Sequence, residues 1–529
     1  MPRSDRRQFV LAIDLGSSGP KVALVADDGQ MVAHAREHIE TYFLPAGGVE
    51  QDPEDWWRAC THGVRQVLDV ARPPIEDVIG VTCTGQWSVT VPVDRAGKPL
   101  MRAVHWMDSR GAPYTREITG GLIKVAGYGA RKLVRWLRLT GGVPVHSGND
   151  ALAHVLFIKH GCPDVYQQTH ALLEPTDYLG MRLTGRMAAT QATIFPYLLT
   201  DNRDLNKVDY DPGLLAWSGV DRAKMPDLVP VTSVLGKILP AAAAEWGLGS
   251  HVQVVVGCGD TSAAAVGSGA VHDFDGHLCI GTSSWLTCHI PFKKTSIGSY
   301  MGTMPAAIPG RNLIVAEQGP AGKCLELFVD RWFFANDPNL QPVAGFDRYQ
   351  HALSLAANVP AGSDGLIFLP WVNGAGPPTG DAFMRGGFLN QTLRTGRAEA
   401  LRAVLEGVAY NLNWLLTAQE RFLGRRYAEL RFSGGGAQSE LWCQILADVF
   451  DRPIRQIAEP NHAIVRGAAY LALMGLGRLN VDDIPKIVKT SRVFTPRLEN
   501  RAVYDHWFGE FVRAYRANRA LFKRWNGSK

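Results

Sequence analysis

Short apolar runs that end in turns of small residues recur along this chain. Residues 9–13 and 22–26 are apolar and flank the turn Gly16-Ser17-Ser18-Gly19, which predicts a β-hairpin. Residues 278–290 repeat this pattern around Gly281-Thr282-Ser283. The two segments lie about half a chain apart, and a repeated strand–turn–strand unit indicates a duplicated domain. We therefore expect two related domains with a cleft between them.

The rest of the pattern alternates strands with helices, which is typical of α/β proteins. Further strands, each followed by small residues, are expected at 77–84, 253–256 and 429–432. Apolar residues at helical spacing predict helices over 53–70, 399–422, 439–448 and 504–525. The expected organisation is an N-terminal domain over residues 1–252, a C-terminal domain over 253–487, and a helical tail over 488–529 that packs back on the body.

Composition narrows the class of protein. The chain has 529 residues, of which 46% are hydrophobic and 20% charged; this is typical of a globular protein and excludes disorder and fibrous repeats. A net charge of +5 over this length gives no reason to expect a nucleic-acid partner. No apolar run reaches the ~18 residues of a membrane span, and the eight cysteines show no CxxC spacing. We expect a reduced, cytoplasmic protein that binds neither nucleic acid nor membrane.

The two repeated turns have the chemistry of a phosphate site. Glycines let backbone N–H groups approach an anion, and hydroxyl groups add hydrogen bonds. Asp14 precedes the first turn and could hold Mg²⁺ directly or through water, whereas Cys279 stands at the matching position of the second repeat. The alternative is an ordinary hairpin turn with a capping Asp. Two such hairpins in register favour the phosphate interpretation.

A second carboxylate, Asp260, follows the apolar strand at 253–256 in the turn Gly257-Cys258-Gly259-Asp260. A carboxylate at the carboxyl end of a buried strand points into the ligand crevice of an α/β sheet, where it could accept a proton from an attacking hydroxyl. The alternative is a helix cap, because an alanine-rich segment follows. The two roles are compatible, since a helix N-terminus also favours an approaching anion.

A third glycine-rich turn, Gly434-Gly435-Gly436, lies between a strand and a helix and permits close approach of a base, ribose or phosphate. A tight strand–helix turn explains it equally well. The segment from Gly319 to Cys324 has neither the spacing nor the final Ser/Thr of a P-loop, and no GxGxxG follows a strand. P-loop and Rossmann interpretations therefore lose support.

Two charged clusters have ordinary explanations. The first cluster is His272, Asp273, Asp275 and His277, which fits no standard zinc spacing and favours a solvated turn. The second cluster is Arg131, Lys132, Arg135 and Arg138, interleaved with Leu133, Trp136, Leu137 and Leu139. A solvated helix face is expected there rather than a nucleic-acid or membrane surface.

Taken in order, the motifs resemble those of the FGGY carbohydrate kinases, within the actin/hexokinase/heat-shock ATPase superfamily, from about residue 9 to about residue 480. The matching pieces are residues 14–21, Trp106-Met-Asp108-Ser-Arg110, Pro175-Thr-Asp-Tyr-Leu through Leu-Thr-Gly185, Gly257-Cys-Gly-Asp260, Gly281-Thr282-Ser283, Phe368-Leu-Pro-Trp371 through Arg385-Gly386, residues 406–411, residues 434–442 and residues 463–469. Each piece is weak alone, and nine in family order are highly specific.

The resemblance implies two ribonuclease-H-like domains that flank an active-site cleft, and phosphoryl transfer from ATP·Mg²⁺ to a hydroxyl of a sugar or polyol. Asp260 would be the catalytic base and Asp14 would place the metal. Phosphate contacts are expected from Gly16, Ser17, Ser18, Lys21, Gly281 and Thr282. Nucleoside contacts are expected from Gly322, Gly434, Gly435, Gly436 and Ser439. Sugar-side contacts are expected from Gln86, Trp87, Asp108, Asp260 and Thr261. Many relatives form homodimers, so a homodimer is possible here.

The nearest branch resembles xylulokinase, with one important departure. Xylulokinases usually carry Gly-Gln-Met-His-Gly where this chain has Gly85-Gln86-Trp87-Ser88-Val89. Trp87 is larger than Met and stacks on the apolar face of a sugar, whereas Ser88 is a shorter hydrogen-bonding group than His. The acceptor therefore stays open among xylulose, ribulose, gluconate, erythritol and glycerol. A non-catalytic nucleotide-binding relative is the alternative from another class.

Overall fold

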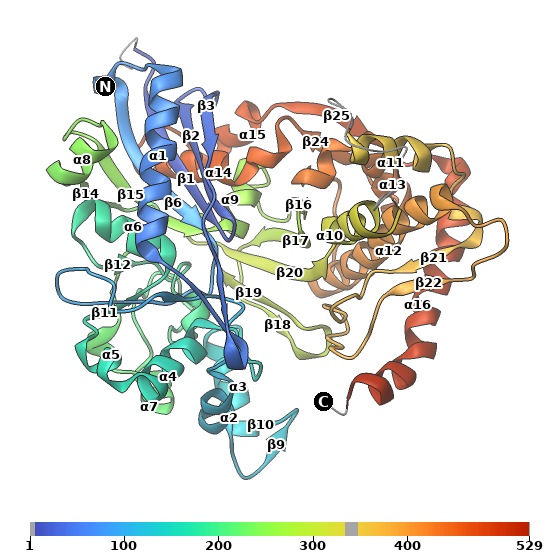
Figure 1. The fold of residues 1–529 in the computed structure, drawn as a ribbon, viewed down its shortest axis with the longest axis horizontal. Helices are drawn as coiled ribbons and strands as arrows, with labels where there is room; N and C mark the ends of the chain where they lie inside the picture. Colours follow the sequence, from blue (N-terminus) through green and yellow to red (C-terminus); the bar gives the residue numbers. More distant parts are fainter. Residues whose placement is uncertain (1–5, 334–346, 528–529) are drawn as a thin grey trace.

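The computed structural model describes residues 6–333 and 347–527 and contains two large sheets, on the left and right of Figure 1. The first sheet has the strand order β14-β15-β6-β1-β2-β3. Its strands are β1 (Phe9–Gly16), β2 (Gly19–Ala26), β3 (Met31–Arg36), β6 (Val78–Gly85), β14 (Val234–Lys237) and β15 (Gln253–Gly259). Strands β1, β6 and β15 run parallel, and the others pair antiparallel.

The second sheet repeats this arrangement and adds a hairpin, in the order β18-β19-β20-β17-β16-β23-β24-β25. Its strands are β16 (Gly276–Ile280), β17 (Ser283–Ile290), β18 (Thr295–Ser296), β19 (Met301–Pro305), β20 (Asn312–Pro320), β23 (Leu430–Ser433), β24 (Ile454–Ile457) and β25 (Thr490–Phe494). Three strands, β16, β23 and β24, run parallel, as β1, β6 and β15 do in the first sheet. The duplication predicted from the two hairpins is therefore confirmed.

Helices cover both sheets, and apolar periodicity predicted all of those named next except the helix over residues 175–184. Helices α1 (Pro53–Ala71) and α6 (Pro175–Thr184) pack on the first sheet. Helices α12 (Arg397–Leu423) and α13 (Glu440–Phe450) pack on the second. Asp52 caps α1, because its side chain accepts a hydrogen bond from the Glu54 N–H (2.9 Å). Trp56, Val64 and Val67 lie on the buried face of that helix.

Two further helices cross between the sheets, α9 (Asp260–Gly267) and α14 (Ala463–Gly475) (Figure 1). They meet at Gly267 and Gly467. A Cβ atom at Gly267 would lie 1.8 Å from the Ala463 carbonyl oxygen, and one at Gly467 would lie 1.8 Å from the Ala263 carbonyl oxygen. The two backbones are therefore in direct contact, which only glycine allows.

The face of α14 away from this crossing packs on the first sheet, although α14 lies near the end of the chain. One apolar cluster contains Val10, Ala12 and Val25 of the first hairpin together with Ala469 and Leu473 of α14. All five side chains are fully buried. A helix from the second half of the sequence thus completes the core of the first domain.

A helical region is inserted into the first domain and lies below its sheet in Figure 1. It contains α2 (Ala112–Thr119), α3 (Ala130–Leu139), α4 (Ala151–Gly161), α5 (Pro163–Gln168) and α7 (Pro212–Ser218). Small sheets surround it: β4 (Tyr42–Leu44), β5 (Gly48–Gln51) and β8 (Ala103–Val104); β7 (Val91–Val93) and β11 (Ala171–Leu173); β9 (Lys124–Val125) and β10 (Tyr128–Gly129); β12 (Ala188–Ala189) and β13 (Asp227–Leu228). The remaining named elements are α8 (Pro240–Trp246), α10 (Gly322–Glu326), α11 (Arg348–Ala357), β21 (Ile367–Leu369), β22 (Gly387–Leu389), α15 (Ile484–Ile487) and α16 (Leu498–Asn526).

The pairing of β15 bears on the boundary between the domains. The predicted boundary at residues 252 and 253 separates β15 from β6, its hydrogen-bonded neighbour in the first sheet. We propose a boundary after α9 instead, since β16 begins the second sheet. The predicted tail over 488–529 likewise contains β25, which pairs with β24; residues 528 and 529 lie outside the described part.

The tail helix α16 packs back on the second domain, where Tyr504, Phe511 and Tyr515 are buried in the core. Polar contacts hold its first turns: the Asp448 carboxylate accepts hydrogen bonds from the Arg497 N–H (2.8 Å) and the Asn500 side chain (2.7 Å).

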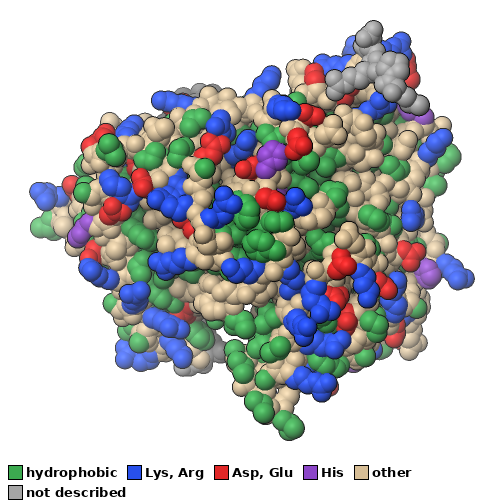
Figure 2. All heavy atoms as spheres, turned by 180° about the vertical axis from the view of Figure 1, so that it is seen from behind, with side chains coloured by type: hydrophobic (Ala, Val, Ile, Leu, Met, Phe, Trp, Pro, Cys, Tyr) green, Lys and Arg blue, Asp and Glu red, His purple; other side chains and the backbone are tan. Residues whose placement is uncertain are grey.

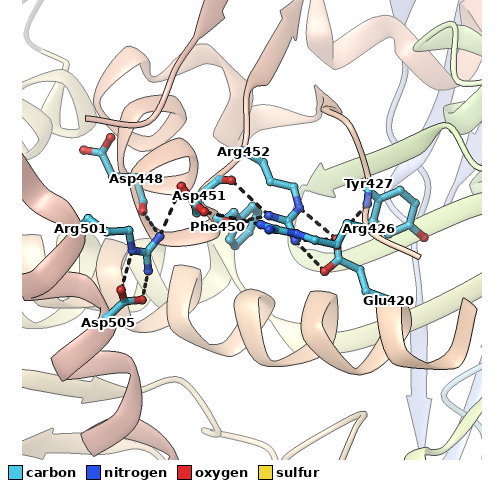
Figure 3. A network of polar contacts seen from close by, with 9 residues as sticks. All are labelled: Glu420, Arg426, Tyr427, Asp448, Phe450, Asp451, Arg452, Arg501 and Asp505. Atoms are coloured by element: carbon cyan, nitrogen blue, oxygen red, sulfur yellow. Dashed lines mark hydrogen bonds and ion pairs between the residues drawn. The ribbon is translucent and has the colours of Figure 1, made fainter. Parts of the chain in front are cut away.

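Figure 3 shows the neighbouring contacts, in which Arg501 reaches the Asp448 carbonyl oxygen and Arg452 forms a nearly buried ion pair with Glu420 (2.6 Å). These interactions join α12, α13 and α16.

The surface carries both signs of charge. Lys and Arg side chains stand beside Asp and Glu over the face in Figure 2. On α3, Leu133 and Trp136 are buried, while Arg131 and Arg138 are exposed, as expected for a solvated helix face. Across residues 6–333 and 347–527, no helix combines the length and apolar character that a membrane span requires.

Candidate active site

The carboxyl ends of three parallel strands meet at one edge of the first sheet. In the register, Leu15 of β1 and Gly259 of β15 both pair with Gly85 of β6. The residues that follow, Gly16, Gln86 and Asp260, therefore lie side by side. Asp260 is also the first residue of α9, so the strand end and the helix start expected for it are both present.

Asp14 and Lys21 face each other across the first hairpin. They are paired in the antiparallel register of β1 and β2, and the Lys21 Nζ lies 3.1 Å from the Asp14 Oδ2. Asp14 is only 2% exposed, so its carboxylate needs a cationic partner. Lys21 supplies one charge and stays partly accessible, which leaves it free to contact an anion as well.

Asp260 is half-buried beside other acidic groups. Burial is the main cause that raises the pKa of Asp260 to about 7, and the negative charges of Asp14 and Glu317 raise it further. Opposing causes are smaller: the Thr261 N–H donates to the Asp260 Oδ1 (2.7 Å), and Lys21 is near. The result is a carboxylate whose pKa is close to neutral pH, as suits a general base.

These carboxylates also bear on metal binding. Among the described residues, no group of three or more His, Cys, Asp or Glu side chains forms a ready-made metal site. Mg²⁺ bound with a nucleotide needs none, because it typically takes one or two carboxylates, waters and phosphate oxygens. Asp14 and Asp260 interact strongly enough to shift a pKa, and a hard cation would relieve that repulsion. The oxygen donors present therefore fit Mg²⁺.

A cavity of about 430 Å³ lies between the two hairpins. Among the residues that line it are four expected at phosphate or nucleoside: Lys21, Gly281, Gly434 and Gly435. It also takes in basic and aromatic groups that the sequence did not single out, namely His34, Arg36, Trp285 and His462. The cavity joins the edge of the first sheet to the strand ends of the second.

Of the nucleoside candidates, Gly434 and Gly435 line this cavity, whereas Gly436, Ser439 and Gly322 are not among its lining residues. Gly434 has a φ of +85°, and a Cβ there would lie 2.5 Å from the Ile280 carbonyl oxygen, so the turn requires glycine. Gly436 packs on Ile280, and the Ser439 hydroxyl accepts the Trp442 N–H as the cap of α13 (3.2 Å). The Gly322 N–H donates to the Gly281 carbonyl oxygen (3.0 Å), which buttresses the second turn.

The turn residues themselves lie at accessible positions. Ser18 and Thr282 are exposed at the tips of their hairpins, and Gly16 and Ser17 are half-buried. The Ser17 hydroxyl accepts a hydrogen bond from the Trp106 Nε1 (2.9 Å). This leaves the Ser17 O–H free to donate.

The sugar side is built around Trp87. Its Nε1 donates to the Thr193 carbonyl oxygen (3.0 Å), and its ring stacks on Phe195 with centroids 5.6 Å apart. Ser88 adopts a φ of +57°, a left-handed conformation that is uncommon away from glycine and tends to occur at functional sites. The Thr261 hydroxyl is buried and has no hydrogen-bond partner in the structure. Trp87 thus offers a fixed aromatic face, and Thr261 an unused polar group.

Gln86 lies at the same edge but deeper, at 4% exposure. Its Nε2 donates to the Gln51 Oε1 (2.7 Å), whose own Nε2 donates to the Ser17 carbonyl oxygen (2.8 Å). The Gln86 Oε1 is buried without a partner in the structure. This chain of amides connects the sugar side to the phosphate turn, and Gln51 gave no signal in the sequence.

Asp108 does not lie on the cleft surface, in contrast to its expected sugar contact. Its side chain is fully buried, and its carboxylate accepts the Val49 N–H (2.8 Å) and the Arg110 N–H and Nε (both 2.9 Å). A carboxylate with these partners holds a turn together. The residue of this motif that reaches the site is Trp106, which is 42% exposed.

Glu317 is the second functional candidate that sequence reasoning missed. It lies on β20, pairs with Trp285 of β17, and is exposed toward the site, where its charge acts on Asp260. No turn or glycine motif marks it in the sequence. The His272 cluster, by contrast, holds no site, because His277 is buried and bonded to Thr287 (2.9 Å) and Ser433 (2.7 Å).

Comparison with known proteins agrees with this geometry. A model of the N-terminal domain of the FGGY family of carbohydrate kinases matches residues 9–267, and one of its C-terminal domain matches residues 279–476. The xylulose kinase of Staphylococcus epidermidis is 27% identical over 524 residues, covering 97% of this chain and 98% of the relative. The autoinducer-2 kinase of Enterobacter sp. strain 638 is 26% identical over 527 residues, covering 96% and 94%.

The fold is shared with a solved gluconate kinase from Lactobacillus acidophilus, which superimposes with a TM-score of 0.85 at 20% identity and covers 98% of this chain and 100% of that one. Two related sheets, in a chain with these relatives, define an ATP-dependent sugar kinase with two ribonuclease-H-like domains. The chain belongs to the FGGY family of carbohydrate kinases.

Proposed function

We propose that this kinase phosphorylates a hydroxyl of a neutral sugar or polyol, with Asp260 as the base that accepts the hydroxyl proton. The observation that carries the proposal is the position of Asp260, at a strand end beside the first phosphate turn, with its pKa raised to about 7. In a loose transition state, such a base mainly orients the attacking oxygen. Trp87 would stack on the carbon face of the acceptor, and Thr261 and Gln86 would bind its other hydroxyls.

On the donor side, the turns around Ser17, Ser18 and Thr282 would bind the ATP phosphates through backbone N–H and hydroxyl groups. Lys21 would contribute a positive charge, and Gly434 and Gly435 would line the nucleoside. Asp14 would hold Mg²⁺, directly or through water, and the ion would neutralise charge on the phosphates when bound. Closure of the two domains would exclude water from the transferred group.

The charges of the site favour a neutral acceptor over an aldonate. The negative charges of Asp14 and Glu317 both act on Asp260, and Lys21 is the cation that acts on it in the opposite sense. An acidic substrate would approach this cluster against like charge. Xylulose is supported by the name of a relative that matches nearly the whole chain. Trp87 and Ser88 stand in place of the usual Met-His pair, which makes other ketoses and polyols equal candidates.

The test is ADP release from ATP·Mg²⁺ across ketopentoses, polyols and aldonates. We expect turnover that depends on one neutral acceptor, with aldonates at least about tenfold poorer in kcat/KM, because each unfavourable charge contact costs a kcal/mol or more. ATP hydrolysis that is independent of every acceptor would contradict a kinase and favour a nucleotide-binding relative.

The pH dependence of kcat/KM tests the base. Because Asp260 must be ionised, kcat/KM should be full above its pKa of about 7 and fall with decreasing pH below it. In Glu317→Gln, one of the charges that raise this pKa is removed, so the acidic limb should move to lower pH. Initial rates between acidic and weakly basic pH measure both enzymes. An unshifted limb in the variant would mean that another group governs the profile.

A further inference from the structure

A second cavity, of about 690 Å³, lies away from the active site and is lined by four basic side chains. Arg138 comes from the end of α3 and Arg203 from the loop before α7, both in the inserted helical region of the first domain. Lys293 and Lys294 come from the link between β17 and β18 in the second domain. The cavity therefore spans the two domains.

Neutral oxygens position both lysines. The Lys293 Nζ donates to the Leu137 carbonyl oxygen at the end of α3 (2.8 Å), a contact from the second domain to the first. The Lys294 Nζ donates to the Phe422 carbonyl oxygen. A carbonyl acceptor orients an ammonium group without adding a negative charge, and each ammonium group keeps further N–H donors for a ligand.

Few carboxylates offset the positive charge of the side chains that line this cavity. Arg203 is paired with Asp201 (2.6 Å). Arg138 is exposed and forms no ion pair within the described residues, whereas Arg135 of the same basic cluster is paired with Asp211. Burial lowers the pKa of Lys293, Asp201 opposes this, and Arg203 adds to it. Of the four cations that line this open cavity, Arg203 is the one with an ion pair among the described residues.

The wall between these cations is apolar. Phe292 is 39% exposed and Ile297 is 60% exposed, and both line the cavity together with Pro291. An anion with a carbon body would cover them. A phosphate monoester carries close to two negative charges and three acceptor oxygens, which suit arginine and lysine donors from several directions. A nucleic acid needs an extended basic stripe, whereas the basic side chains here are the four that line one cavity.

We propose that this cavity binds the phosphate monoester of a small sugar or polyol, with Arg138 and Lys293 as its principal cationic contacts from the two domains. The bound ester would connect the inserted helical region to the β17–β18 link and would resist movement of one domain against the other. A kinase of this architecture must open to release its products. The ligand is therefore expected to inhibit turnover. It would be either the enzyme's own product or another phosphorylated metabolite.

Calorimetric titration without ATP tests the site, with ribose 5-phosphate and inorganic phosphate as probes. Wild-type enzyme should bind ribose 5-phosphate, and Arg138→Glu should weaken that affinity at least about tenfold, since a charged hydrogen bond is lost and a like charge is gained. Arg131→Glu, an exposed position on the same helix outside the cavity, is the matched control and should change the affinity less than about twofold. Inorganic phosphate should bind more weakly, because it leaves the apolar wall uncovered.

The assay separates this proposal from the kinase assignment. Asp260→Asn should keep the binding and its dependence on Arg138, whether or not that variant turns over. If Arg138→Glu and Arg131→Glu bound ribose 5-phosphate with equal affinity, the ester would lie in the catalytic cleft and the proposal would be overturned. No binding to the wild-type enzyme would overturn it as well. Equal affinity for the two probes would overturn the role of the apolar wall. Comparing ribose 5-phosphate with the phosphorylated product of the acceptor panel then distinguishes the two sources.

Discussion

Asp260→Asn is expected to lower kcat by about 10²–10⁴-fold, the contribution of a positioned general base. The substitution keeps the shape of the side chain and removes the group that accepts the proton. ATP binding should persist, because the cavity lined by Lys21, Gly281 and Gly434 does not include Asp260. Steady-state ADP release measures the loss in kcat, and titration calorimetry with ATP·Mg²⁺ measures the binding that remains.

The matched control is Asp275→Asn. Asp275 is also a half-buried aspartate whose pKa is raised chiefly by burial, but it lies before β16, outside the cleft. Its replacement should leave kcat within about twofold of wild type, as for a substitution away from the chemistry. Near-normal turnover in Asp260→Asn would refute the assignment of the base, and equal losses in both variants would point to a general effect of removing a buried charge.

Gly467→Ala should lower the free energy of unfolding by about 3 kcal/mol, at the upper end of the range for overpacking a tight contact. The new Cβ would lie 1.8 Å from the Ala263 carbonyl oxygen and 2.6 Å from the Gly267 nitrogen, both of them backbone atoms that cannot rotate away. Helices α9 and α14 would have to separate. Because α9 begins with Asp260, kcat should fall as well.

Thermal unfolding measures the first effect, with a drop in Tm of about 3 °C for a chain of this length. Gly509→Ala is the control, since Gly509 lies inside α16 with no atom within 4 Å of the added Cβ. There the usual helical preference for alanine should stabilise the protein by about 0.5–1 kcal/mol. Opposite signs for two identical exchanges would isolate the helix crossing as the cause. A Tm unchanged by Gly467→Ala would show that the crossing can relax.

Sequence patterns predicted the elements that local rules govern. The two hairpins, the capped start of α1 and the glycine turn before Gly436 depend on residues that are neighbours in the chain, and all are present. The position of Asp260 at a strand end was predictable for the same reason. The sheet to which β15 belongs could not be predicted in this way, because the pairing of β15 with β6 joins residues that lie far apart in the sequence.

The residues of the candidate site also fall into those that a local motif reveals and those that only strand pairing brings to the site. Glycines and hydroxyls on short turns could be found by motif, whereas Glu317 lies in the middle of an ordinary strand and reaches the site through the pairing of β17 with β20. Asp108 shows the converse error. Its motif marks a site, but its carboxylate serves the backbone of Val49 and Arg110, and the exposed group is Trp106 two residues earlier.

The packing of α14 on the first hairpin has a consequence for synthesis. On the ribosome, residues 6–267 emerge long before Ala463–Gly475, so Val10, Ala12 and Val25 lack their covering helix for most of translation. The nascent first half therefore exposes an apolar sheet face until α14 has been synthesised. By the same logic, the two halves expressed as separate polypeptides should be insoluble alone and should reassemble into one particle when they are produced together.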